Sequence, residues 1–76
     1  MVPVIDLPAT GQNIKQLARA RKITVTALGA ICHVSRTAVY KWYSGVCMPT
    51  IDNLVALSRL FDVAIDDLIA VTEVNG

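Results

Sequence analysis

Residues 24–45 read TVTALGAICHVSRTAVYKWYSG, and the order of capping and apolar residues in this stretch decides the fold. Thr24 and Ser35 are each suited to begin a helix, because their hydroxyl groups can accept an amide hydrogen bond in the first turn. His33 and Val34 alone lie between the two helical segments, and Gly45 suits the left-handed conformation that ends a helix. The stretch predicts two short helices joined by a tight turn.

The second of these helices, over residues 35–43, has two chemically different faces. Ala38, Val39 and Trp42 are spaced for burial, so the helical period assigns Trp42 to the core rather than to a base-stacking role. The opposite face carries four side chains that form hydrogen bonds: Arg36, Thr37, Tyr40 and Lys41. A helix fits the major groove of duplex DNA, where an arginine can hold guanine with two hydrogen bonds. We expect these four residues to contact bases, and Ser35 and Ser44 to contact phosphate.

Helical periodicity continues on both sides of this stretch. A helix is expected over residues 12–22, and its inward positions by spacing are Ile14, Leu17, Ala18 and Arg21, with Arg21 at the solvent edge of that stripe. In the segment that begins at Thr24, the expected buried residues are Leu28, Ile31 and Cys32, and Gly29 is expected to admit another helix. Thr50 begins a further helix that ends at residues 62–63. A short last helix is expected over residues 65–71, with Leu68 and Ile69 inward.

The two ends of the chain have extended character. Pro3, Pro8 and Gly11 exclude a helix from the first eleven residues, and residues 2–7 are compatible with a short strand. Residues 71–74 alternate apolar and polar side chains, as a brief strand does. We therefore expect an extended arm over residues 1–11, an all-α five-helix domain over residues 12–71, and a tail over residues 72–76.

The charges are divided between the two halves of the chain, although the net charge is only +1. Residues 7–51 contain six basic side chains and no acidic one, whereas residues 52–76 contain five acidic side chains against Arg59. A basic half without carboxylates can attract a polyanion, and it can equally be a solvated face without a partner. Lys15, Arg19 and Lys22 fall on the outer side of the first helix, where solvation is the simpler interpretation and contact with phosphate is the alternative.

Several classes of protein are disfavoured. No uncharged stretch reaches the roughly 18 residues of a membrane span, and the start lacks a basic leader. We therefore expect a cytoplasmic protein, in which Cys32 and Cys47 are reduced. Cys32, His33 and Cys47 lack the paired spacing of a zinc site, so no metal is expected. An enzyme is not expected either, because the single histidine has no partner at a suggestive spacing, and no small-molecule substrate is evident.

At residues 12–71 the chain resembles the Cro/repressor-type (XRE-family) helix-turn-helix domains, which have a lambda-repressor-like fold. The residues that carry the resemblance are Ile14-Lys15-Gln16-Leu17, Ile23-Thr24, Leu28, Val34-Ser35-Arg36, Ala38-Val39, Lys41-Trp42, Gly45, Pro49, Ile51, Asn53-Leu54, Leu57-Ser58, Leu60-Phe61-Asp62-Val63 and Asp66-Asp67-Leu68. The resemblance implies a five-helix bundle that binds operator DNA as a homodimer, without a cofactor, and so a transcriptional regulator, most simply a repressor. It also implies dimer contacts near the last helix and tail, with Leu68, Val71 and Val74 as candidates and residues 2–7 as an added strand.

The chain departs from the family pattern at four positions. Val25 stands where the family often has a glutamine that binds phosphate, and His33 stands where the turn usually has glycine. Ala18 and Tyr43 together replace an arginine–glutamate pair, which predicts that Tyr43 packs against the small Ala18. Val25 and the low net charge keep a second interpretation open, in which the chain is an antitoxin or another protein-interaction module with the same fold.

Overall fold

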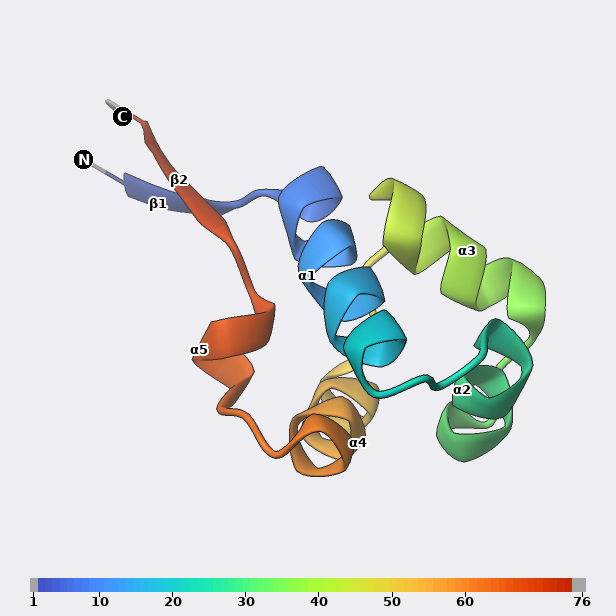
Figure 1. The fold of residues 1–76 in the computed structure, drawn as a ribbon. Coiled ribbons are helices and arrows are strands. Elements are labelled where there is room, and N and C mark those ends of the chain that lie inside the picture. The colour runs from blue at the N-terminus through green and yellow to red at the C-terminus, as the bar shows by residue number, and fades with distance from the viewer. Residues whose placement is uncertain (1, 75–76) are drawn as a thin grey trace.

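The computed structural model describes residues 2–74, and within them it contains five helices and one two-stranded sheet (Figure 1). The elements are β1 (Val2–Ile5), α1 (Leu7–Ala20), α2 (Val25–Cys32), α3 (Arg36–Ser44), α4 (Ile51–Phe61), α5 (Ile65–Leu68) and β2 (Val71–Val74). The predicted helical bundle with short terminal strands is confirmed. The last helix is shorter than predicted, since it ends at Leu68 rather than at Val71.

Local capping chemistry sets most of the helix boundaries. The hydroxyl groups of Thr24, Ser35 and Thr50 each accept an amide hydrogen bond from the residue three positions later, at 3.1, 3.1 and 3.2 Å. His33 and Gly45 take the left-handed conformation after α2 and α3, with φ of 58° and 79°. These caps satisfy amide and carbonyl groups that the helix itself leaves without partners. The sequence predicted those at Thr24, Ser35, Thr50 and Gly45, but not the left-handed His33.

The start of α1 differs from the prediction, because the exclusion of helix from the first eleven residues was wrong. The carboxylate of Asp6 accepts a hydrogen bond from the amide of Ala9 at 3.0 Å and caps the helix. Pro8 lies in the first turn, where no intrahelical amide donor is needed. Gly11 lies against the backbone of α3, and a Cβ atom there would be 2.0 Å from the carbonyl oxygen of Trp42. Gly11 therefore permits a close helix contact and does not break the helix.

The core lies between the helices. Its fully buried side chains include Ile14, Ala18, Leu28, Val39, Leu57, Phe61 and Leu68. Trp42 is 4% exposed and belongs to the core, as predicted, but Ile31 is 44% exposed because it lies on the outer side of α2. Arg21 is exposed, in agreement with its predicted place at the solvent edge of the inward stripe. Its guanidinium donates a hydrogen bond to the carbonyl of Phe61 and lies 5.6 Å from that ring centroid.

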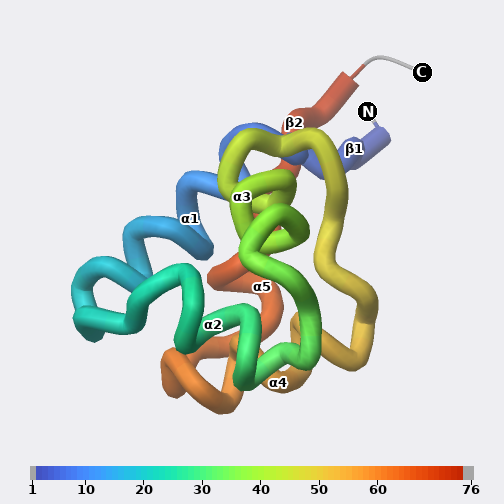
Figure 2. Tube along the Cα trace, turned by 90° about the vertical axis from the view of Figure 1, so that its right-hand side faces the viewer, coloured from blue at the N-terminus to red at the C-terminus, as the bar shows by residue number. Residues whose placement is uncertain are grey.

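Strands β1 and β2 form an antiparallel ribbon that extends away from the helices (Figures 1 and 2). Val2 pairs with Val74 and Ile5 pairs with Val71. The ribbon is fastened at its base by Thr10, a buried residue of α1 whose hydroxyl accepts a hydrogen bond from the amide of Ala70 at 3.0 Å. In the part of the chain that the structure describes, no helix combines the length and the apolar character that crossing a membrane requires.

Candidate nucleic-acid interface

The turn between α2 and α3 is held by a close backbone contact. The amide of Val34 donates to the carbonyl of Gly29 at 2.9 Å, and a Cβ atom on Gly29 would lie 2.8 Å from the carbonyl oxygen of Val34. Gly29 therefore makes room for the backbone of the turn rather than for another helix, which corrects the sequence expectation. The result is a fixed placement of α3 directly after α2.

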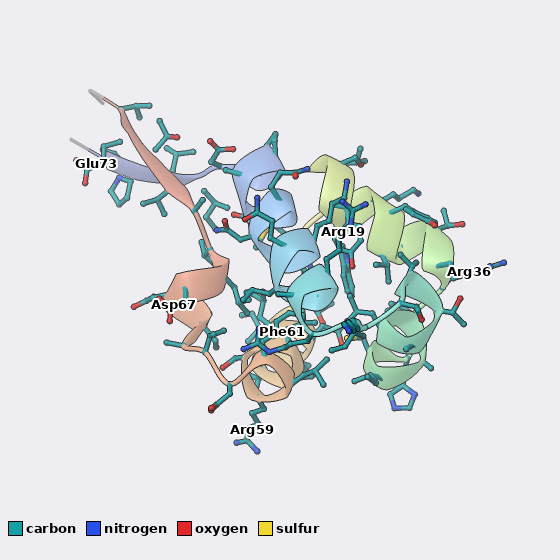
Figure 3. The ribbon with its side chains drawn as sticks, in the orientation of Figure 1. Arg19, Arg36, Arg59, Phe61, Asp67 and Glu73 are labelled. Carbon is teal, nitrogen blue, oxygen red and sulfur yellow. The ribbon has the colours of Figure 1, made fainter. Side chains whose placement is uncertain are left out.

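Helix α3 is anchored by one face and exposed on the other. Val39, Trp42 and Tyr43 are buried, and the backbone of α3 contacts α1 at Gly11. The four residues predicted to contact bases, Arg36, Thr37, Tyr40 and Lys41, are all exposed. Tyr40 is 58% exposed, and Arg36 extends away from the bundle in Figure 3. The structure thus brings two cations, a phenol and a hydroxyl together on one accessible helix.

The two serines predicted to contact phosphate differ in their chemistry. The Ser35 hydroxyl oxygen accepts the amide of Ala38 at 3.1 Å, so its proton is available for a further acceptor. The Ser44 hydroxyl donates to the carbonyl of Lys41 at 3.3 Å, so it must rotate before it can donate to a phosphate oxygen. Both residues are exposed. The free protein therefore presents Ser35 as the readier donor.

A groove with a volume of about 670 Å³ runs beside α3 and was not anticipated from the sequence. It is lined by Gln12, Lys15, Arg19, Ile23, Thr24, Val25, Tyr40, Tyr43 and Ser44. Lys15 and Arg19, which the sequence assigned to a solvated outer side of the first helix, thus share a surface with α3. Their spacing of four residues already indicated one helix face, but the position of α3 opposite that face is a tertiary relationship.

The phenol of Tyr43 lines the groove, and the residue is buried. Burial raises the pKa of the Tyr43 phenol, and the positive charge of Arg19 partly opposes this shift. Ala18 and Tyr43, which replace the charged pair typical of the family, are both buried, and because neither side chain is charged, no buried charge is left without a partner. Val25 is half-buried and offers the groove an apolar wall without a hydrogen-bond donor.

The cysteines occupy two different environments. Cys32 is a buried free thiol whose pKa is raised by burial, whereas Cys47 is free and exposed. Among residues 2–74, no three side chains of His, Cys, Asp or Glu come together in a group that could hold a metal ion.

The amino-acid sequence of this chain is similar to those of known helix-turn-helix proteins. Residues 14–68 match the family model described as "Helix-turn-helix". Over 59 residues the chain is 36% identical to the HTH-type transcriptional activator BcrR of Enterococcus faecalis, covering 78% of this chain and 29% of BcrR. Over 62 residues it is 29% identical to the uncharacterized HTH-type transcriptional regulator YobD of Bacillus subtilis (strain 168), covering 82% of this chain and 55% of YobD. The chain thus matches only part of the length of each relative.

A solved structure has the same fold. The restriction-modification controller protein C.AhdI from Aeromonas hydrophila superposes with a TM-score of 0.73 at 22% sequence identity, covering 83% of this chain and 96% of that chain. The family match spans α2, the turn and α3 together with most of the surrounding core. This chain belongs to the helix-turn-helix family of the Cro/repressor (XRE) type.

Proposed function

We propose that this domain binds double-stranded DNA in a sequence-specific manner and regulates transcription. The observation that carries the proposal is the exposure of Arg36, Thr37, Tyr40 and Lys41 on a helix whose other face is fixed in the core. Family membership supports the same function, since such domains bind duplex DNA. The base-contacting roles of the four residues are part of this proposal.

The dimensions of α3 suit this role. A helix with its side chains is about 10–12 Å across, close to the roughly 12 Å width of the major groove. Arg36 occupies the first turn of α3, the end at which recognition helices usually meet base edges. Its guanidinium can hold O6 and N7 of one guanine, while Ser35 donates to a neighbouring phosphate.

We propose further that two copies bind together and place their α3 helices in successive major grooves, roughly 34 Å apart. Leu68, one of the candidate contacts, is fully buried within its own domain, so it is unsuited to a dimer contact. Val71 and Val74 are 57% and 44% exposed on β2 and stay candidates. The terminal ribbon is therefore the part of the molecule on which the dimer proposal rests.

The two edges of the ribbon differ in their capacity to pair. The amide of Asp6 donates to the carbonyl of Ala70, which continues the register of β1 and β2. Backbone groups alternate in direction along a strand, so the backbone of Pro3 faces outward on the free edge of β1. Proline has no N–H group, and this edge therefore lacks a hydrogen-bond donor at that position. On β2, Val71 and Glu73 direct complete backbone groups outward. We therefore propose that β2 pairs with β2 of the second copy.

Occupancy of the DNA by the bound domain is the simplest basis for proposing either repression or activation of transcription. A domain seated in the major groove excludes other proteins from the same stretch of DNA, so we propose repression. A reporter placed behind a selected site is expected to lose transcription when the protein is supplied. A gain of transcription would contradict repression and leave DNA binding intact.

Selection of binding sites from random duplexes, followed by sequencing, tests the function directly. The expected result is one enriched site with two related half-sites about ten base pairs apart. The absence of any enriched site, together with co-purification of a second protein, would contradict the proposal and favour the antitoxin or protein-interaction interpretation.

A further inference from the structure

The groove between α1 and α3 (the α1–α3 groove) combines an apolar lining with two positive charges. Ile23 and Val25 are half-buried and Tyr43 is buried, and these three supply its apolar surface. Lys15 and Arg19 supply the cations from one face of α1, and none of the residues that line the groove is acidic. Its volume of about 670 Å³ lies within the roughly 300–1,000 Å³ of small-molecule sites. The groove therefore suits a small ligand with an apolar body and a negative charge.

Arg19 places its charge near the aromatic ring of Tyr43. The positive charge of Arg19 acts on the phenol, since it opposes the rise in pKa that burial causes. Figure 3 shows Arg19 between α1 and α3. A guanidinium offers two parallel N–H donors, which match the two oxygens of a carboxylate. A carboxylate with an apolar ring attached can therefore contact the guanidinium and the apolar surface at once.

Two of the departures from the family pattern contribute to this chemistry. Val25 stands where a glutamine is frequent, and Tyr43 replaces the glutamate of a charged pair. Both residues line the groove, so both replacements put apolar or aromatic surface where the family has a hydrogen-bonding or charged group. The two cations of α1 thus face a more apolar groove than the family pattern gives.

We infer that the α1–α3 groove binds a small apolar carboxylate and that this ligand opposes the binding of DNA. The carboxylate pairs with Arg19 and Lys15, and the apolar body lies against Val25 and Tyr43. The opposition to DNA rests on the proposed function, in which α3 enters the major groove. Tyr40 lines the α1–α3 groove and is also one of the side chains proposed to contact bases. Ligand and duplex therefore compete for the same side chain.

Cinnamate is a suitable probe, because it joins one carboxylate to a rigid apolar body. Its titration into isotope-labelled protein should shift the amide NMR signals of residues that line the groove, up to a saturating value. Cinnamamide has the same shape without the charge, and it should bind about tenfold more weakly because the charged hydrogen bonds are lost. Equal binding of the two compounds, or shifts confined to other parts of the protein, would overturn the inference.

Two variants separate the charged and the apolar parts of the site. Arg19→Gln should weaken cinnamate binding several-fold and reduce its advantage over cinnamamide, whereas Val25→Gln should weaken both compounds alike. Val25→Thr keeps the shape of the side chain and should act in the same direction if Val25→Gln does not fold. Arg59→Gln removes an equal charge from an exposed position on α4 and should bind as the wild type does. Wild-type binding by both Arg19→Gln and Val25→Gln would place the ligand elsewhere and overturn the inference.

Competition is measured on a labelled duplex that carries the selected site. Saturating cinnamate should lower the affinity of the wild type for this duplex several-fold and that of Val25→Gln much less, with acetate at equal concentration as the control for ionic strength. An unchanged affinity of the cinnamate-bound wild type would overturn the opposition to DNA.

The ligand site and the proposed function can fail separately. If no duplex is selected but cinnamate binds with the expected pattern, the proposed function and the competition fail and the ligand site stands. If a duplex is selected and cinnamate does not bind, the inference fails and the proposed function stands.

Discussion

Gly11 of α1 lies against the carbonyl of Trp42 on α3, so close that a Cβ atom at residue 11 would be 2.0 Å from that oxygen. The same Cβ atom would be 2.8 Å from the carbonyl oxygen of Tyr43. These contacts are with backbone, which cannot rotate away as a side chain can. The separation of α1 and α3, and with it the width of the groove between them, depends on this glycine.

Gly11→Ala should destabilise the domain, although the same change in an open helix usually stabilises by up to about 1 kcal/mol. Forcing a methyl group into a filled contact typically costs about 1–3 kcal/mol, and we expect a loss of that size in denaturant unfolding. Gln16→Ala, at an exposed position of α1, is the control and should stay within about 0.5 kcal/mol of the wild type. A stabilised Gly11→Ala protein would refute the close contact.

Arg36→Ala should relax the sequence preference at one base pair of each half-site. The expected loss of discrimination there is about 1–3 kcal/mol, the value of one bidentate contact with guanine. The measurement is repeated site selection with the variant, and Arg59→Ala is the matched control. Unchanged selected sites for Arg36→Ala would show that Arg36 does not read a base.

The affinity for DNA should fall steeply with salt, because basic side chains displace counterions from phosphate. Two neutralised phosphates alone give a loss of about tenfold between 50 and 200 mM salt. Titration of one labelled duplex at several salt concentrations measures the slope. A flat titration would leave the basic segment over residues 7–51 without a role in binding.

The two thiols should differ in reactivity and in their effect on stability. Iodoacetamide should modify exposed Cys47 and spare buried Cys32 until denaturant is added. Because the folded state raises the pKa of Cys32, the contribution of this thiol to stability is complete below the ordinary thiol pKa of about 8.5 and is lost as the pH rises through the raised value. Cys32→Ala should remove this part of the alkaline decline in unfolding free energy, and an unchanged decline would contradict it.

Glu73→Pro should weaken self-association at least tenfold, because it removes the outward amide of the free β2 edge. Proline is tolerated at an outward-facing edge position, so the domain should remain folded. Glu73→Gln keeps the amide and should associate as the wild type does. Sedimentation equilibrium distinguishes these cases, and a wild-type protein that stays monomeric at high concentration would remove the dimer proposal.

Features set by neighbouring residues could be predicted from the sequence. The caps at Thr24, Ser35 and Thr50, the left-handed Gly45 and the burial of Trp42 all follow from side chains within one or two turns. The start of α1 was missed although its signals are local. Asp6 stands three residues before Ala9, and the proline after Leu7 is allowed in a first turn.

Relationships between distant segments could not be predicted. The groove requires the separation of α1 and α3, which the 3.6-residue period of either helix does not contain. Thr10 was missed because its partner, Ala70, lies 60 residues away along the chain. The hydrogen bond from the Arg21 guanidinium to the carbonyl of Phe61 was also missed, because the two residues are 40 positions apart.

The pairing of Val2 with Val74 joins the two ends of the described chain, so the ribbon is its contact of greatest sequence separation. This separation predicts the order in which the parts of the domain fold. Closing so large a loop costs entropy before any strand hydrogen bond forms, whereas α1, α2 and α3 meet through short connections. The helices are thus expected to assemble first and the ribbon last. Amide hydrogens of β1 and β2 should then exchange with solvent through partial opening, well before those of α1.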